Sequence, residues 1–198
     1  MNAVSKVRRL LESTGSARAR DLNALGLANA QLGRLVEQGK LVRLARGVYA
    51  LADREPDELE SLAVVAQRAP NAIFCLLTAL RFHGLTTQAP REIWIGIAKQ
   101  RNPPPLTWPP LRVVRFSGVG LTLGVETHIR NGLPLKVTGI ARTVVDCFKF
   151  RNKIGLDVAL ESLSEVRRNH RATIDDIWKT AAPLRMTNVM RPYLESLA

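Results

Sequence analysis

Residues 41–51 read "LVRLARGVYAL", two short apolar stretches separated by a turn that contains Arg46 and Gly47. Gly47 can adopt the positive φ that tight reversals between strands often require. The pattern therefore predicts a hairpin whose Tyr49 packs back against a small core. Arg43 and Arg46 lie at this reversal of the chain, either as solvated charges or as a wing that contacts a polyanion. The predicted strands cover residues 40–44 and 48–51, joined by residues 45–47.

Three helices are predicted before this hairpin, because apolar residues recur there at helical spacing. They cover residues 4–14, 17–25 and about 29–38. Ser16 and Asn29 are candidate N-caps of the second and third helix, since their side chains can accept hydrogen bonds from a helix start. Helix, helix, helix and hairpin is the element order of a winged helix-turn-helix.

The remaining sequence predicts a second, larger region in which helices and strands are mixed. The segment "ADREPDELESL" is acidic and contains Pro56, and it separates two patterned regions as a linker does. We therefore expect an α+β protein with a winged helix-turn-helix domain at residues 1–54 and a mixed α/β domain at residues 55–198. Expected helices cover residues 57–69, 72–84, 140–150, 156–168, 173–182 and 190–197; expected strands cover 92–98 and 111–117, followed by a hairpin at 123–139 with its turn at Asn131 and Gly132.

The composition indicates a polyanionic partner. The 198 residues carry a net charge of +12 with a pI near 10.8, and the first 55 residues are the denser in positive charge. Neutralising phosphates releases counterions and drives association, although a basic protein need not bind nucleic acid. The longest apolar run, residues 72–80, is far shorter than the roughly 20 residues of a membrane span. Without a signal-peptide pattern, we expect a cytoplasmic protein that does not bind membranes.

Metal and disulfide chemistry are not expected. Cys75 and Cys147 lie in apolar stretches and are predicted to be buried free thiols. The sequence has no CxxC motif, and the three histidines, His83, His128 and His170, lack ligand spacing. No zinc site and no cofactor are therefore predicted.

The third predicted helix has a polar outer face once Leu32, Leu35 and Val36 point inward. In a winged helix-turn-helix this face enters the major groove, where Arg contacts guanine and Gln or Asn contacts adenine. The same pattern also suits a solvated face, and Glu37 would repel phosphate. Arg43 and Arg46 are expected to hold backbone or minor groove, which positions a domain without reading sequence. The candidate DNA-binding residues are Asn29, Gln31, Arg34, Arg43, Arg46, Arg18 and Arg20.

Catalysis is not predicted. Arg142 and Asp146 lie four residues apart on one helix face and form an expected local ion pair. A nucleophile set of Asp146 with His83 and Cys147 has no glycine elbow, phosphate loop or ligand cluster to support it. The acidic pair at 175–176 suits a metal-dependent nuclease less well than a favourable charge at a helix N-terminus.

The string "GKLVRLARGVYAL" at residues 39–51 resembles the end of the N-terminal winged helix-turn-helix of the AbiEi antitoxin family. A segment like "G-x-L-x-R-x-x-R-G-x-Y" closes that domain. "LTALRFHGL" at 77–85, the strand-like "EIWIGI", and "VTGIARTVVDCF" at 137–148 are similar to the family's C-terminal domain, in which an "R-T-x-x-D" helix follows a strand. The residues that match the two motifs are Gly39, Leu41, Arg43, Arg46, Gly47 and Tyr49, and Arg142, Thr143 and Asp146.

The resemblance implies an antitoxin of a type IV toxin–antitoxin system linked to phage defence. The winged domain would bind inverted repeats in its own promoter and repress the operon, and the C-terminal domain would support antitoxin activity and cooperative DNA binding. The partner would be an AbiEii-type nucleotidyltransferase toxin, without a stable complex being required. The alternative is a module whose C-terminal domain binds a protein or an RNA, without a toxin partner.

Overall fold

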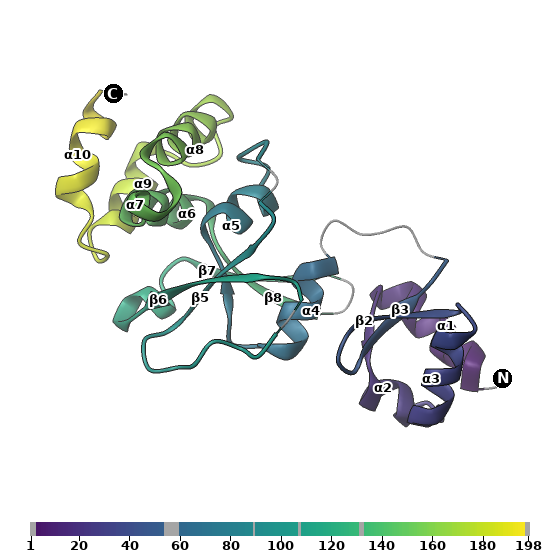
Figure 1. Ribbon diagram of the computed structural model, residues 1–198. Helices are drawn as coiled ribbons and strands as arrows, with labels where there is room; N and C mark the ends of the chain where they lie inside the picture. The colour runs from purple at the N-terminus through teal and green to yellow at the C-terminus, as the bar shows by residue number, and fades with distance from the viewer. Residues whose placement is uncertain (1–2, 54–59, 89, 107, 131–132, 197–198) are drawn as a thin grey trace. The chain divides into compact units, whose positions relative to one another are not determined.

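The computed structural model describes residues 3–53, 60–88, 90–106, 108–130 and 133–196 (Figure 1). It divides into two compact units. The N-terminal unit comprises residues 1–70 with 106–109 and 128–135, and the C-terminal unit comprises 71–105, 110–127 and 136–198. Helices and sheets are mixed along the chain, as expected. The predicted boundary between residues 54 and 55 lies outside the described residues and stays a prediction.

The N-terminal unit begins with helices and a small antiparallel sheet. The strands follow the order β1-β3-β2, so the first strand joins the far side of the hairpin. The elements are α1 (Ala3–Thr14), β1 (Ala17–Arg18), α2 (Ala19–Ala24), α3 (Asn29–Glu37), β2 (Leu41–Ala45), β3 (Val48–Leu51) and α4 (Glu60–Arg68).

The core of this unit forms from the apolar faces of its first three helices and the inner side of the hairpin. Leu22 and Leu32 are fully buried, and burying a leucine contributes roughly 1.5–3 kcal/mol. Leu35 and Val36 pack against the same cluster, which confirms the inward face predicted for α3. Tyr49 also packs on it, as expected.

The predicted start of the second helix is wrong, and so is its predicted N-cap. Ala17 and Arg18 pair with Tyr49 and Val48 as strand β1, so α2 begins only at Ala19. Ser16 does not cap α2: it is buried, and its Oγ accepts a hydrogen bond from Gln67 Nε2 at 3.2 Å. Tertiary pairing overrides the helical pattern here.

Asn29 is not the N-cap of α3 but its first helical residue. The cap position belongs to Ala28, and the N–H of Ala28 donates to Gln31 Oε1 at 2.9 Å. A glutamine at the third helical position that reaches back to the cap N–H satisfies one of the unpaired groups near a helix start. Gln31 therefore has a local structural role.

The hairpin has a shorter connection than predicted. Ala45 pairs with Val48, so only Arg46 and Gly47 form the turn. Gly47 has φ +77°, which confirms the need for glycine. The register shifts between Arg43 and Ala45, so the strand carries a bulge that alters the direction of its outer end.

A mixed five-stranded sheet follows, in the order β6-β5-β4-β8-β7. β5 pairs antiparallel with β4 and parallel with β6, while β4 pairs parallel with β8. Its strands are β4 (Ile73–Phe74), β5 (Ile93–Ala98), β6 (Leu111–Phe116), β7 (Val125–Arg130) and β8 (Leu133–Thr138). The predicted hairpin turn at Asn131 and Gly132 lies outside the described residues.

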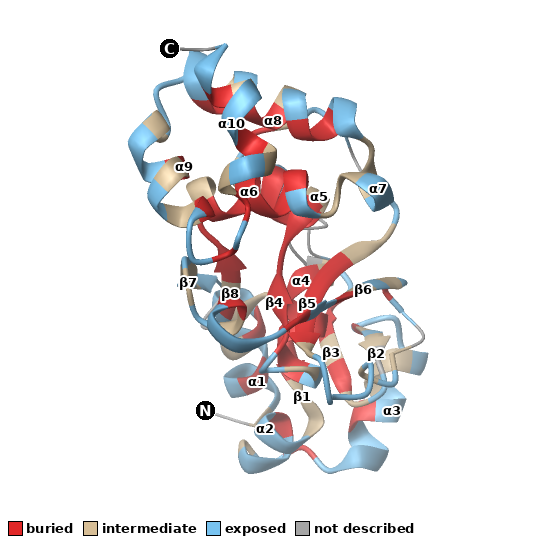
Figure 2. Cartoon of the chain, turned by 90° about the vertical axis from the view of Figure 1, so that its left-hand side faces the viewer, coloured by how far each residue is buried: buried red, intermediate tan, exposed pale blue. Residues whose placement is uncertain are grey.

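Six helices and one short 3-10 turn accompany the sheet in the described part. They are α5 (Leu76–Phe82), η1 (Gly118–Leu121), α6 (Ile140–Lys149), α7 (Arg151–Ile154), α8 (Leu156–Arg168), α9 (Ile174–Ala181) and α10 (Thr187–Glu195). Helices α6–α10 gather at one end of the sheet, and α6 is buried along most of its length (Figure 2).

The helix predicted over residues 72–84 is wrong in its first third. Ile73 and Phe74 form strand β4, and the N–H of Cys75 donates to the carbonyl of Trp94 at 3.1 Å before α5 begins. A short apolar run suits a buried strand as well as a buried helix, so the periodicity could not separate them.

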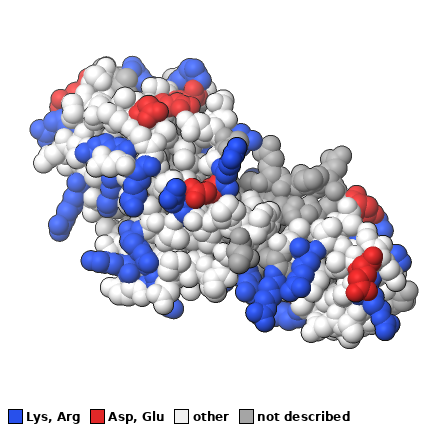
Figure 3. All heavy atoms as spheres, in the orientation of Figure 1, with Lys and Arg blue, Asp and Glu red and all other residues white. Residues whose placement is uncertain are grey.

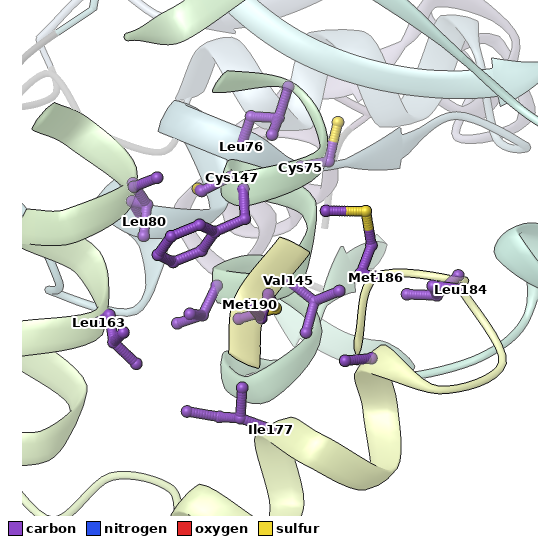
Figure 4. Packing of buried hydrophobic residues seen from close by; sticks show 14 of the residues in the cluster. Cys75, Leu76, Leu80, Val145, Cys147, Leu163, Ile177, Leu184, Met186 and Met190 are labelled. Carbon is purple, nitrogen blue, oxygen red and sulfur yellow. The ribbon is translucent and has the colours of Figure 1, made fainter. Parts of the chain in front are cut away.

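Around α6, apolar side chains from five helices form the main core of the C-terminal unit. Figure 4 shows Leu76 and Leu80 of α5, Val145 and Cys147 of α6, and Leu163, Ile177 and Met190 of α8, α9 and α10. None of the helices that the structure describes has the length and apolar character needed to cross a membrane.

Candidate nucleic-acid interface

Helix α3 presents a polar face to solvent. Leu32 is fully buried, and this fixes the rotation of the helix so that Ala30, Gln31, Gly33 and Arg34 are exposed. Apart from the chain neighbours of Gly33 and the backbone of the helix itself, no atom would lie within 4 Å of a Cβ added there. The helix thus offers an open strip with one cation, Arg34, near its middle.

Two of the predicted base-reading side chains already have partners. Gln31 Oε1 accepts from the N–H of Ala28 at 2.9 Å, and the side-chain amide of Asn23 donates to Asn29 Oδ1 at 3.1 Å. Bidentate contact with adenine uses both the oxygen and the nitrogen of an amide. With these bonds in place, the amide oxygens of Gln31 and Asn29 are partly engaged and the two side chains are held in local contacts, whereas Arg34 is on the exposed face with a donor-only guanidinium.

The hairpin carries the second group of predicted residues. Arg43 on β2 and Arg46 in the turn are both exposed. Arg43 is paired with Tyr49 across the hairpin, so the two side chains leave the same face of the sheet. Tyr49 packs against the core, whereas Arg43 is exposed.

Strand β1 brings two further predicted arginines to this hairpin. Arg18 pairs with Val48, and the N–H of Ala19 donates to the carbonyl of Gly47 at 2.8 Å. Arg20 follows directly and is exposed, with Asp21 as an ion partner at 3.4 Å. Burial lowers the pKa of Arg18, and the neighbouring charge of Arg20 lowers it further.

A fifth arginine, Arg68, reaches the hairpin from α4. Its Nη1 donates to the carbonyl of Arg46 at 3.3 Å. We call Arg18, Arg20, Arg46 and Arg68 the tip cluster. Sequence reasoning missed Arg68. The acidic segment before α4 separates that helix from the first domain, and no local pattern indicates that α4 bonds to the hairpin.

Arg8 is unsuited to phosphate contact. Its guanidinium pairs with Glu12 and with Asp53, each at 2.9 Å, and hydrogen bonds to these two carboxylates raise the pKa of Arg8. Its charge is therefore balanced locally. Elsewhere Lys and Arg side chains clearly outnumber acidic ones on the face drawn in Figure 3.

The residues considered for catalysis are engaged structurally. Arg142 Nε and Asp146 Oδ2 lie 2.9 Å apart and buried, which confirms the predicted ion pair. Cys147 is fully buried, and burial raises the pKa of its thiol far above the ordinary value, so the nucleophilic thiolate is disfavoured. His83 Nε2 lies 2.7 Å from the carbonyl of Thr138.

The acidic pair at 175–176 serves helix α9. Asp176 accepts from the N–H of Thr173 at 3.0 Å in a capping box, and Asp175 pairs with Lys179 at 2.7 Å. Among residues 3–53, 60–88, 90–106, 108–130 and 133–196, no group of three His, Cys, Asp or Glu side chains could hold a metal ion.

Comparison with known proteins agrees with the N-terminal part of this description. Among curated proteins, none matches the chain in sequence. The crystal structure of the RV2827C protein from Mycobacterium tuberculosis is similar in fold, with a TM-score of 0.63 and 13% identity over 89% of this chain and 70% of that chain. Residues 5–52 match the family model described as "Transcriptional regulator, AbiEi antitoxin". The resemblance to the AbiEi family of antitoxins and transcriptional regulators is thereby confirmed, and residues 5–52 are the segment that carries it.

Proposed function

We propose that this protein is a sequence-specific DNA-binding transcriptional repressor with a winged helix-turn-helix at residues 1–54. In this proposal α3 is the recognition helix and the β2–β3 hairpin is the wing. The observation that carries it is the hairpin with exposed Arg43 and Arg46, which follows directly after a helix with an exposed polar face in a segment of the AbiEi family.

In the proposed complex the first half of α3 enters the major groove. Arg34 donates to the O6 and N7 acceptors of guanine, and Gln31 contributes an N–H donor. Arg43 and Arg46 contact the sugar–phosphate backbone or the minor groove, with Arg18 and Arg20 on flanking phosphates. Asn29 lies at the start of the helix, where phosphate approaches a positive helix end.

The finer proposal is an autoregulating antitoxin of a type IV toxin–antitoxin system. Its operator would be double-stranded DNA with inverted repeats, and residues 55–198 would support antitoxin activity. Its functional partner would be an AbiEii-type nucleotidyltransferase toxin, and a stable complex between the two is not required. The protein would act in the cytoplasm without a cofactor or catalytic step.

A gel shift on the region upstream of the gene tests the DNA-binding proposal. We expect the wild-type protein to shift this duplex, and Arg34→Ala and the double variant Arg43→Ala/Arg46→Ala each to weaken the shift. Arg8→Ala is the matched control, because it removes an arginine whose charge is balanced by Glu12 and Asp53. Unchanged affinity of both test variants at physiological salt would overturn the assigned contacts.

Co-expression tests the antitoxin proposal separately. We expect the product of the neighbouring gene to arrest growth alone and the full-length chain to relieve that arrest. Affinity purification of the chain should recover little of the other protein. Continued arrest in the presence of the chain would contradict an antitoxin role while leaving DNA binding intact.

A further inference from the structure

We propose that Arg68 of α4 both fixes the tip of the β2–β3 hairpin and contacts a phosphate of the bound duplex. This inference rests on the proposed function. It assigns a DNA-binding role to a residue outside the segment that matches the family model, residues 5–52. The working DNA-binding unit then extends through α4 rather than ending at residue 54.

The end of α4 is attached to the residue that precedes β1 by a buried hydrogen bond. Gln67 Nε2 donates to Ser16 Oγ at 3.2 Å, and both residues are buried. Because a buried polar group without a partner is costly, this bond favours one position of the helix end. Arg68, the next residue, is consequently held beside the start of β1.

From that position Arg68 reaches the turn itself. Its Nη1 donates to the carbonyl of Arg46 at 3.3 Å, while its side chain remains exposed. A guanidinium has five N–H donors in a rigid fork, so one bond to a carbonyl leaves donors for a second acceptor. The planar fork of this cation matches carboxylate and phosphate groups, and a DNA duplex presents phosphates.

Electrostatics favour an anion at the same place. Within the tip cluster, Arg20 and Arg68 lie near enough to Arg18 for their charges to act on it, and Asp21 is the carboxylate that opposes them there. Arg68 also donates to the backbone carbonyl of Arg46, so the exposed Arg46 belongs to the same end of the hairpin. Burial lowers the pKa of Arg18, and the like charges of Arg20 and Arg68 lower it further. A phosphate backbone along the tip would relieve that repulsion.

The competing explanation is that Arg68 has only a structural role. A cation in the last turn of a helix interacts favourably with the helix dipole, and the bond to Arg46 could simply steady the turn. If Arg68 has only a structural role, its substitution changes the affinity for DNA by altering the shape of the hairpin. A phosphate contact also changes the number of counterions released on binding, which the salt dependence measures.

The test compares full-length wild type with Arg68→Ala, Arg68→Gln and Arg68→Lys by fluorescence anisotropy on the upstream duplex over a range of sodium chloride. Arg68→Gln retains a side-chain donor for the Arg46 carbonyl but loses the charge. We expect Arg68→Ala and Arg68→Gln to reduce the slope of log K against log salt by about 0.9, and Arg68→Lys to retain it. Arg9→Ala, which removes one exposed charge from α1, should leave the slope unchanged.

The outcomes separate this inference from the proposed function. If wild type binds and Arg68→Ala and Arg68→Gln keep both affinity and slope, the Arg68 contact is overturned and DNA binding stands. Weaker binding by all three variants with unchanged slopes assigns Arg68 a structural role only and likewise overturns the contact. If wild type does not bind the duplex, the proposed function fails first.

Discussion

Arg142 joins α6 to the segment that runs from the end of β6 through η1. Its guanidinium pairs with Asp146, donates to the carbonyls of Leu123 at 2.5 Å and Gly120 at 3.0 Å, and lies 5.0 Å from the ring centroid of Phe116. Burial raises the pKa of Asp146, and the attraction of Arg142 opposes that change. The motif "RTVVD" therefore has a structural explanation that does not require catalysis.

Removing one member of this buried pair should be costly. We expect Asp146→Ala to lower the free energy of unfolding by about 3–5 kcal/mol, because Arg142 is left buried without a counter-charge. Asp175→Ala is the matched control, since Asp175 and Lys179 form an exposed pair with the same four-residue spacing. Urea unfolding followed by circular dichroism measures both. Equal, small losses would show that the buried pair does not hold this unit together.

The reactivity of the two cysteines tests whether they are buried in the core of the native protein. Cys75 and Cys147 are fully buried free thiols, and burial raises both pKa values well above the ordinary range. We expect neither to react with a thiol reagent in the native protein at pH 8, and both to react after unfolding. Because the shift is upward, raising the pH to 9 should not expose a native thiolate. Rapid native labelling of Cys147 would revive the nucleophile hypothesis.

At the scale of the elements, a substitution in α3 can distinguish a recognition helix from a helix that is only exposed to solvent. Glycine inside a helix costs about 0.5–1 kcal/mol relative to alanine, and a Cβ at Gly33 meets no atom within 4 Å. Gly33→Ala should therefore stabilise the free protein. If the exposed face of α3 lies in the major groove, the added methyl should at the same time weaken binding to the operator.

Thermal unfolding and anisotropy on the same Gly33→Ala sample measure the two effects. Gly47→Ala is the contrasting variant, because Gly47 has φ +77° and an alanine there should destabilise the hairpin. Increased stability of Gly33→Ala with unchanged operator affinity would place α3 away from the bases.

The elements also show what a sequence can predict. α1, α3, β5, β6 and α8 follow from local periodicity and match the structure closely. The two-residue strands β1 and β4 do not, because each exists only through pairing with a strand distant in sequence. Ser16 likewise has cap-forming chemistry, but burial beside Gln67 gives its hydroxyl another partner.

For the whole molecule, the sequence predicted a mixed chain with two patterned regions but not its topology. The order β6-β5-β4-β8-β7 depends on parallel pairings such as Phe74 with Val137, which leave no local signal. The residues of the candidate site were also predicted only in part. Arg34, Arg43 and Arg46 are exposed as expected, whereas Arg68 became visible only when α4 was seen to bond to the hairpin.

The net charge of +12 is a property of the whole molecule, and it affects binding to any DNA. A strongly basic chain binds any polyanion at low salt, so weak binding to unrelated DNA does not support a repressor. Specific recognition requires a preference for the operator that persists at physiological salt, where purely electrostatic binding has fallen steeply.

The central claim, that the hairpin arginines contact DNA phosphates, is tested most directly by the salt dependence of operator binding. Wild type and Arg43→Ala/Arg46→Ala are titrated onto the upstream duplex at several sodium chloride concentrations. We predict weaker binding by the double variant and a slope of log K against log salt that is shallower by about 0.9 for each phosphate that its arginine no longer neutralises. Identical affinities and identical slopes would contradict the claim.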